Sequence, residues 1–310
     1  MSAPTPVHIR AKGKLLLTGE YFVLDGASAL ALPVRYGQSL EAVPSEAPGL
    51  LRWQSREQDG EIWFSAAFDL PSLRVQHASE GVVAHTLSTL LQACRRQRPD
   101  FLARPDGWQL STQTDFPRPW GLGTSSTLIA SLARWAGCDP YALLFETLGG
   151  SGYDIACAFA EGPLLYRLHA GQPQVQALHF APSYAHSLYF VHLGKKQDSR
   201  AGIHRYRTRQ AGNPTRLAHV SQLTERCAAA DTLAALEQVL LEHEQLVAEA
   251  LDLEPVKQAL FHDYWGTVKS LGAWGGDFVL ATSERGEAAT RAYFREKGCG
   301  TVLPWNAMMG

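Results

Sequence analysis

The sequence predicts an α+β fold, in which strands and helices are mixed without a regular βαβ rhythm. Residues 7–43 alternate apolar and polar positions between glycines, a pattern typical of strands joined by tight turns. A glycine-rich turn, GLGTSS at 121–126, leads directly into an apolar helix. Residues 217–265 are rich in Ala, Leu, Glu and Gln, which indicates mostly helical structure.

The first half of the chain adds a hairpin, a helix, a strand and two further helices to the opening strands. Asp59-Gly60 marks the tip of the hairpin. The first helix ends in a basic turn, which the helix dipole favours. Asp139-Pro140 indicates an N-cap followed by proline at the first helical position. In chain order we expect the hairpin at 53–69, the helix at 79–98, the strand at 108–116, and helices through about 136 and from about 139.

The second half returns to strand patterning before it becomes helical. A strand, a helix and a last strand close the chain. We expect strands within 163–193, a basic irregular stretch at 194–216, helices at 217–265, a strand at 278–283, a helix at 286–297 and a strand at 301–305. Length alone favours about two domains, since one domain typically holds ~150 residues, and we place them at 1–175 and 176–310.

The composition excludes several classes of protein. The 310 residues carry a formal charge of −2 with 19% charged side chains, which argues against a protein that coats nucleic acid or an anionic membrane. The N-terminus has no signal-peptide pattern, and no run approaches the ~18 apolar residues of a membrane span. The 5 cysteines are odd in number and form no CxxC, which favours reduced thiols in a cytoplasmic protein.

The clearest local motif is the turn Gly121-Leu122-Gly123-Thr124-Ser125-Ser126. Glycines allow a ligand to approach the backbone, and the first N–H groups of the following helix form a site for phosphate. Thr124, Ser125 and Ser126 add hydroxyl groups for phosphate oxygens or Mg²⁺. Taken alone, the turn is as well explained by an ordinary helix start, and it matches neither the P-loop nor the dinucleotide fingerprint.

Two further glycine-punctuated segments accompany this turn, AKGKLLLTGEYFVLDG near the start and KSLGAWGGDFVLAT near the end. With these three motifs, in the same order across nearly the whole chain, the sequence resembles the GHMP kinases, and GYDIA at 152–156 resembles a bacterial subgroup of them. The resemblance implies the GHMP kinase fold, with an N-terminal ATP domain like ribosomal protein S5 domain 2 and a C-terminal ferredoxin-like domain.

The resemblance also implies the cofactors ATP and Mg²⁺. The triphosphate would lie on residues 121–126, with Thr124 and Ser126 near the phosphates and Ser125 as the metal ligand. Glu146 is a candidate carboxylate ligand for Mg²⁺, although it lies closer to Asp154 along the chain than the family pattern has it.

Lys14 and Asp154 stand where the resemblance places catalytic residues. An aspartate beside an acceptor hydroxyl can take its proton, and an ammonium group can stabilise the resulting alkoxide. From the residues alone, Lys14 can be a surface lysine on a strand, and Asp154 is better explained as a helix N-cap. Glu20 belongs to the predicted substrate-side set, and we interpret it as an ion-pair partner in preference to a catalyst.

The first and third motifs most resemble those of phosphomevalonate kinases, because an aspartate, Asp277, follows Gly275 and Gly276. Mevalonate kinases usually lack that aspartate. Lys12 replaces a common proline, and Trp274 interrupts the glycine run, where it either narrows the substrate space or packs a domain interface.

A basic stretch at 195–209 carries six Lys or Arg and one Asp. It is either a clamp over an anionic substrate, with Lys196, Ser199 and Arg200 as its contacts, or a solvated loop. The segment 233–251 is an amphipathic cover of the second domain or the face of a homodimer.

The sequence therefore predicts an ATP-dependent kinase for a small anionic substrate. We expect 5-phosphomevalonate as the acceptor, with mevalonate as the alternative and a non-catalytic ligand-binding homologue as the third possibility. No nucleic-acid or membrane partner is expected.

Overall fold

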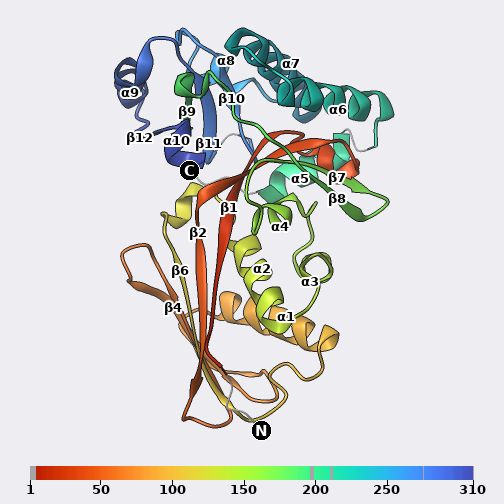
Figure 1. Cartoon of the computed structure of the whole chain (residues 1–310), viewed down its shortest axis with the longest axis vertical. Coiled ribbons are helices and arrows are strands. Elements are labelled where there is room, and N and C mark those ends of the chain that lie inside the picture. Colours follow the sequence, from red (N-terminus) through yellow and green to blue (C-terminus); the bar gives the residue numbers. More distant parts are fainter. Residues whose placement is uncertain (1–4, 196–198, 210–211, 275, 310) are drawn as a thin grey trace. The chain divides into compact units, whose positions relative to one another are not determined.

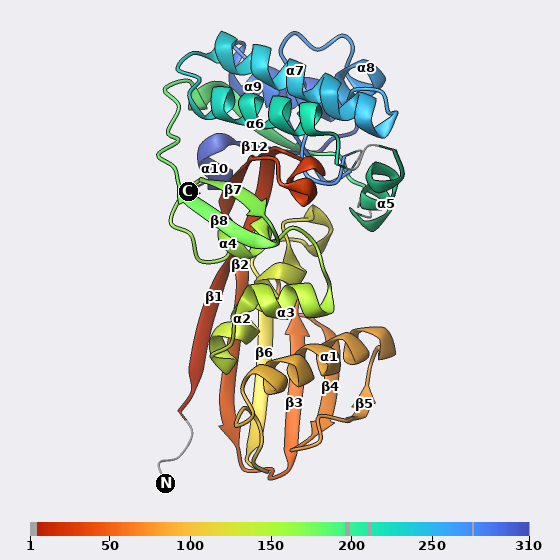
Figure 2. The same cartoon turned by 90° about the vertical axis from the view of Figure 1, so that its right-hand side faces the viewer.

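The computed structural model describes residues 5–195, 199–209, 212–274 and 276–309 (Figures 1 and 2). Within these residues the chain forms two compact units, each assembled from separate stretches. Of the described residues, unit 1 contains 5–13, 36–118 and 123–159, and unit 2 contains 14–35, 119–122 and those from 160 onward. The predicted division after residue 175 stays a prediction, since neither unit is a single continuous segment.

Strands dominate the first part of unit 1. Strand β1 (Val7–Thr18) begins in unit 1 and ends in unit 2, whereas β2 (Ala29–Ser45) begins in unit 2 and ends in unit 1. The other strands of unit 1 are β3 (Leu50–Arg56), β4 (Ile62–Asp69), β5 (Val75–Ala78) and β6 (Gly107–Thr114). They are hydrogen-bonded in the order β5-β4-β3-β6-β2, with β3 and β6 parallel and the other pairs antiparallel.

Helices cover one face of this part of the sheet (Figure 2). They are α1 (Gly81–Gln97), α2 (Thr124–Ala136), α3 (Pro140–Thr147) and the short α4 (Tyr153–Cys157), and a turn of 3-10 helix, η2 (Arg118–Trp120), precedes α2. The alternating burial of β3 sends Leu51 and Trp53 into a core shared with Leu87 and Leu91 of α1 and Ile129 of α2. Period-two strands and period-3.6 helices thus meet through their apolar faces.

Unit 2 contains the remaining strands and a second sheet. β7 (Leu164–His169) and β8 (Gln172–Ala177) extend the first sheet, since β7 pairs with residues 29–31 of β2. The second sheet is antiparallel in the order β10-β11-β9-β12. Its strands are β9 (Leu188–His192), β10 (Val268–Ser270), β11 (Phe278–Thr282) and β12 (Thr301–Pro304).

The helices of unit 2 include a long adjacent pair, α6 and α7, which lie side by side (Figures 1 and 2). Behind the second sheet, Val191, Val279 and Val302 pack with Phe261 and Phe294 in one core. The helical segments are η1 (Phe22–Asp25), η3 (Ala185–Ser187), α5 (Ser199–Arg209), α6 (Pro214–Ala228), α7 (Leu233–Leu251), α8 (Val256–Leu260), α9 (Gly286–Glu296) and α10 (Trp305–Met309).

Most predicted elements are present, and the α+β class is confirmed. The expectation of an irregular stretch at 194–216 is wrong, because residues 199–209 form helix α5. Tyr206 explains the difference: its ring is fully buried against Tyr21 and Phe22, and its hydroxyl donates to Asp25 Oδ2 at 2.7 Å. One buried aromatic residue therefore fixes a segment whose charge pattern alone suggested a loop.

The cysteines are all free, as expected from their spacing, and Cys138 is the least buried of them. A hydrogen bond from Cys94 lowers the pKa of the Cys138 thiol, against the opposing effect of burial. We expect iodoacetamide to alkylate Cys138 first in the native protein, because thiolate character and access control the reaction. Mass spectrometry of peptides after brief labelling measures this order, and faster labelling of the buried Cys157 would contradict it.

Among the described residues, no helix combines the length and the apolar character needed to cross a bilayer.

Candidate functional site

Helix α2 begins without a side-chain cap. Its N-cap residue is Gly123, with φ 93°, which has no side chain to accept a hydrogen bond from the first turn. Ser126 donates its hydroxyl to the carbonyl of Gly123 at 2.8 Å, and Ser125 is exposed. The first N–H groups of a helix need acceptors, and the helix dipole favours an anion there. The start of α2 therefore suits the phosphate group that the sequence predicted.

Gly121 lies where residues from the first and third motifs meet within unit 2. Lys14, half-buried on β1, donates from Nζ to the carbonyl of Gly121 at 2.9 Å, and its backbone N–H donates to the carbonyl of Leu122 at 2.9 Å. The carboxylate of Asp277 lies against the Cα of Gly121, so that a Cβ there would come within 2.6 Å of Oδ1. The φ of 67° favours glycine at this position, and a Cβ there would require the Asp277 carboxylate to move.

Trp120 fixes the segment that precedes Gly121. Its ring makes an edge-to-face contact with Phe278 of β11, with the ring centroids 5.6 Å apart, and lies 6.4 Å from the ring of His192 on β9. His192 Nε2 is also 3.2 Å from the carbonyl oxygen of Pro119. The residues that precede the glycine turn are thus packed against strands β9 and β11 of the second sheet. The sequence alone assigns no role to Trp120, and its position directly before the glycines was the available signal.

The third motif forms the turn between β10 and β11. Asp277 has φ 50°. Two backbone hydrogen bonds fix its position: its N–H donates to the carbonyl of Lys195 at 2.7 Å, and its carbonyl accepts from the N–H of Leu193 at 2.8 Å. Trp274 is buried at 3% exposure, with φ 50°. Gly276 is buried as well, whereas Gly275 lies outside the described residues.

Asp154 lies in the first turn of α4 in unit 1 and is half-buried. The N-cap of α4 is Gly152, with φ 90°, so the interpretation of Asp154 as an N-cap is wrong. The glycine takes the left-handed conformation that starts the helix, and Asp154 follows two residues later. Lys14 belongs to unit 2, so each of the two predicted catalytic residues is described within its own unit.

Glu146 has a partner other than a metal in this structure. Its Oε1 accepts from Nε and Nη2 of Arg96 on α1, at 2.7 Å and 2.6 Å, and the carboxylate is well exposed. In the described part of the chain, no group of three or more His, Cys, Asp or Glu side chains is placed to hold a metal ion. Of the two predicted metal ligands, Ser125 has an exposed hydroxyl at the start of α2, and its role as a ligand of Mg²⁺ stays a prediction.

Glu20 forms a buried ion pair with Lys269, with Oε1 and Nζ 2.5 Å apart and both side chains 0% exposed. Its interpretation as an ion-pair partner is confirmed, whereas its inclusion among the substrate contacts is not supported, because a fully buried carboxylate has no accessible atom for a substrate. Lys196 lies outside the described residues, and the side chains of Ser199 and Arg200 in α5 are not among those described.

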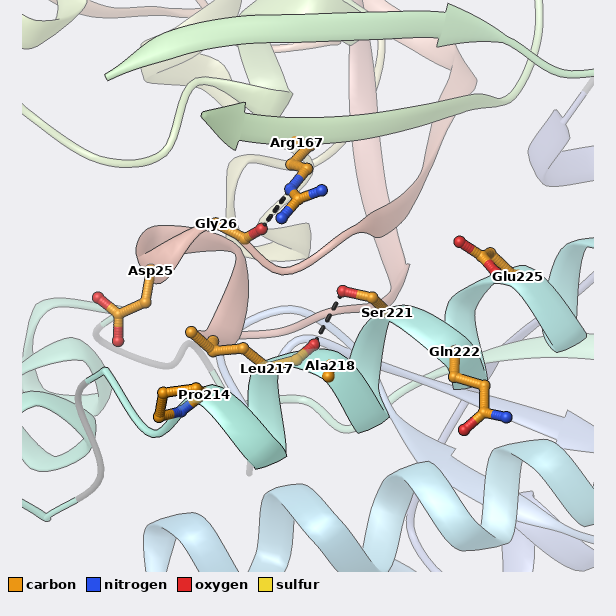
Figure 3. A pocket seen from close by; sticks show the side chains of 9 residues that line it. All are labelled: Asp25, Gly26, Arg167, Pro214, Leu217, Ala218, Ser221, Gln222 and Glu225. Atoms are coloured by element: carbon orange, nitrogen blue, oxygen red, sulfur yellow. Dashed lines mark hydrogen bonds between the residues drawn. The ribbon is translucent and has the colours of Figure 1, made fainter. Parts of the chain in front are cut away.

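A separate hollow lies on the surface of unit 2 between η1, β7 and α6, with a volume of about 480 Å³ (Figure 3). Arg167 reaches over it and donates from Nε to the carbonyl of Gly26 at 2.7 Å. Its other lining residues are Asp25, Pro214, Leu217, Ala218, Ser221, Gln222 and Glu225. None of the residues that the sequence singled out for chemistry lines this hollow.

Comparison with solved structures identifies the fold. The chain is similar to L. major mevalonate kinase in complex with R-mevalonate (TM-score 0.66, 18% identity, 96% of this chain and 94% of that chain covered). It is also similar to Streptococcus pneumoniae phosphomevalonate kinase in complex with phosphomevalonate and AMPPNP (0.67, 16%, 94% and 95%). A third similar structure is Lactococcus lactis galactokinase complexed with galactose (0.61, 11%, 94% and 88%).

No protein-family model matches the chain, and no curated protein matches it. The structural similarity spans nearly the whole length of both chains in each case, so the chain has the GHMP kinase fold. The resemblance seen in the three sequence motifs is confirmed at the level of the fold.

Proposed function

We propose that the protein is an ATP-dependent kinase of the GHMP type that phosphorylates a small anionic acceptor. The observation that carries this proposal is the meeting of the three motifs at Gly121. The ammonium group of Lys14 and the carboxylate of Asp277 both lie against this glycine, which is two residues before Gly123, the N-cap of α2.

The start of α2 would hold the phosphates of ATP. The backbone N–H groups of Thr124 and Ser125 would donate to phosphate oxygens, and the structural neighbour solved with AMPPNP supports nucleotide use. The Ser125 hydroxyl would ligate Mg²⁺, which supplies charge neutralisation when it is bound. The chain's own contribution is the alignment of donors towards an anion.

Lys14 and Asp154 are proposed as the catalytic residues. Lys14 would stabilise negative charge in the transition state, since its Nζ is positioned by the carbonyl of Gly121. Asp154 would accept the proton of an acceptor hydroxyl. It is half-buried in the first turn of α4, and its Oδ1 also accepts from the N–H of Ile155 at 3.0 Å.

For the acceptor we propose 5-phosphomevalonate. The third motif carries Asp277, as in phosphomevalonate kinases, and one structural neighbour was solved with phosphomevalonate. Mevalonate is the second candidate, because another neighbour was solved with R-mevalonate and because Asp154 supplies a base that an alcohol acceptor needs.

Acceptor-stimulated release of ADP tests the proposal. The purified full chain would be incubated with ATP and Mg²⁺ and with mevalonate, 5-phosphomevalonate, homoserine or galactose in turn. We expect the strongest stimulation with 5-phosphomevalonate. Release stimulated by none of the four acceptors would instead favour a ligand-binding protein that keeps the scaffold.

We expect Gly121→Ala to weaken nucleotide use, with KM for ATP raised about tenfold or more. The added Cβ would overlap the Asp277 carboxylate, and alanine is strained at the φ of 67° found at this position. Steady-state kinetics with varied ATP measure the effect. Gly162→Ala is the matched control, because a Cβ at Gly162 meets no atom within 4 Å. Equal KM values for both variants would contradict the role of Gly121.

A further inference from the structure

A buried cluster of four ionisable side chains occupies the interior of unit 2, and the proposed chemistry uses none of them. Glu20 follows β1, His243 and Glu244 lie on α7, and Lys269 lies on β10. Glu20, His243 and Lys269 are 0% exposed, and Glu244 is 3% exposed. Charged groups are rarely buried to this degree without a specific reason.

The cluster bonds to the backbone at Gly19 and Ser270, and Glu244 also accepts from the N–H of Val256 at 3.2 Å. Gly19 donates its N–H to His243 Nε2 at 2.8 Å, which assigns the ring proton to Nδ1 and makes the imidazole neutral. Glu244 accepts from the N–H and the hydroxyl of Ser270, at 3.1 Å and 3.0 Å. Lys269 Nζ donates to the carbonyl of Ser270 at 2.7 Å, in addition to its pairing with Glu20. The cluster therefore ties the end of β1 to the end of β10.

Gly19 and Ser270 lie on the two segments of the chain that also carry the residues in contact with Gly121. β1 carries Lys14, whose Nζ bonds the carbonyl of Gly121, and β10 leads into the turn that ends at Asp277, whose carboxylate lies against Gly121. Tyr21 adds a parallel connection, because its hydroxyl donates to the carbonyl of Ala273 at 2.8 Å. A displacement of Glu20 relative to Lys269 would therefore shift β1 and the turn after β10 relative to one another, and with them the contacts at Gly121.

Stability alone does not account for the cluster. Replacing a buried ion pair by apolar side chains of similar volume is often neutral or stabilising. The cluster is also incompletely satisfied, since Glu20 Oε2 and His243 Nδ1 are buried without a hydrogen bond in the part of the chain that the structure describes. What the pair provides is a single defined geometry between the two strands, because a short contact between opposite charges has a narrow range of favourable positions.

We infer that Glu20 and Lys269 are a positioning pair, which keeps Lys14 and Asp277 at the positions where they contact Gly121. The expected effect of the pair on catalysis rests on the proposed function, whereas the coupling between the ends of β1 and β10 does not. The pair acts through Lys14 and Asp277 and touches no reacting atom.

The test compares Glu20→Gln, Lys269→Met and the double variant with wild type. The glutamine keeps the size of Glu20 and an oxygen that accepts from Lys269, so Glu20→Gln is expected to fold even where Lys269→Met does not. Arg291→Met is the matched control, because it breaks an exposed pair with Glu287 on α9 of the same unit. Each variant is measured for kcat, for KM and for backbone hydrogen exchange.

We expect kcat to fall roughly 10- to 100-fold in Glu20→Gln and in the double variant, with KM for ATP changed less than threefold, because misplacement of about an ångström has effects of this size. Hydrogen exchange is expected to quicken at residues 271–274 and 276–278 as well as at the substituted sites. Arg291→Met should change neither quantity.

Unchanged kcat and unchanged exchange at 271–274 and 276–278 in a folded double variant would overturn the inference and leave the pair a purely structural one. Hydrogen exchange also separates this inference from the proposed function. If wild type phosphorylates none of the acceptors, the proposed function fails. Faster exchange at 271–274 and 276–278 in Glu20→Gln still supports the coupling in that case, whereas unchanged exchange there overturns it.

Discussion

Asp154→Asn is expected to lower kcat by about 10²–10⁴-fold when the acceptor is an alcohol, because an asparagine cannot take the proton of the attacking hydroxyl. The side chain keeps nearly the same shape and lies in the first turn of α4, whose N-cap is Gly152, so the helix should be unaffected. The measurement is kcat and KM with mevalonate at saturating ATP. A loss of less than tenfold would contradict the role of Asp154 as a base.

The same substitution distinguishes the two candidate acceptors. The second pKa of a phosphate monoester is about 6, so 5-phosphomevalonate is already a nucleophile at pH 7 and requires mainly cations. We therefore expect Asp154→Asn to reduce turnover of 5-phosphomevalonate only mildly. A severe loss with this acceptor would contradict the distinction and would assign Asp154 a role in positioning or binding.

Asp139→Asn is the matched control for this experiment. Asp139 is the N-cap of α3 in the same unit and accepts from the N–H of Tyr141 at 2.8 Å and of Ala142 at 3.4 Å. Asparagine is as good an N-cap as aspartate. The control removes one carboxylate charge from unit 1, and we expect its kcat to stay within twofold of wild type.

Lys269→Met is expected to have the largest effect on stability, lowering the free energy of unfolding by about 3–5 kcal/mol at pH 8. The change leaves the carboxylate of Glu20 buried without its partner, whose Nζ lies 2.5 Å away in the native protein. Adding Glu20→Gln should restore most of the loss, because the uncompensated charge is then removed. Urea unfolding of both single variants and the double variant measures this coupling.

An exposed ion pair provides the comparison. Arg291 and Glu287 are separated by 2.6 Å on α9, with side chains 37% and 49% exposed. Such pairs contribute about 0–1 kcal/mol, so Arg291→Met should change the stability far less than Lys269→Met. Equal losses in the two variants would show that burial of the Glu20–Lys269 pair has no energetic consequence.

The pH dependence of stability follows from the same cluster. Burial raises the pKa of the Glu20 carboxyl from 4.5 to about 7, against the lowering effect of Lys269. Because the native state then holds the proton more tightly than the unfolded chain, this contribution to stability is complete below pH 4.5 and is lost as the pH rises through about 7. Burial raises the pKa of the nearby Glu244 carboxyl as well.

His243 acts in the opposite direction, since burial holds its pKa well below 6.5 and its contribution is lost as the pH falls. Cys227 on α6 also faces the cluster, and burial raises the pKa of its thiol. Glu20→Gln removes only the Glu20 contribution. The stability of this variant relative to wild type should therefore rise between pH 5 and pH 8, and a constant difference in urea unfolding across this range would contradict the assignment.

The sequence by itself determined the α+β class, the glycine turn at the start of α2 and the three motifs of a GHMP kinase fold. These features are local: alternation, glycine at positive φ and an N-cap such as Asp139 can be identified from a few neighbouring residues. Asp59-Gly60 likewise marked its hairpin correctly, because the turn chemistry depends on adjacent residues.

Only the tertiary structure decided which distant residues meet. The helix over 199–209 depends on Tyr206 packing against Tyr21 and Phe22, and the contacts at Gly121 join residues 14, 121 and 277. The partner of Glu20 is 249 positions away, on β10. Periodicity carries no information about such pairs, because burial and charge pairing arise only when the strands are placed side by side.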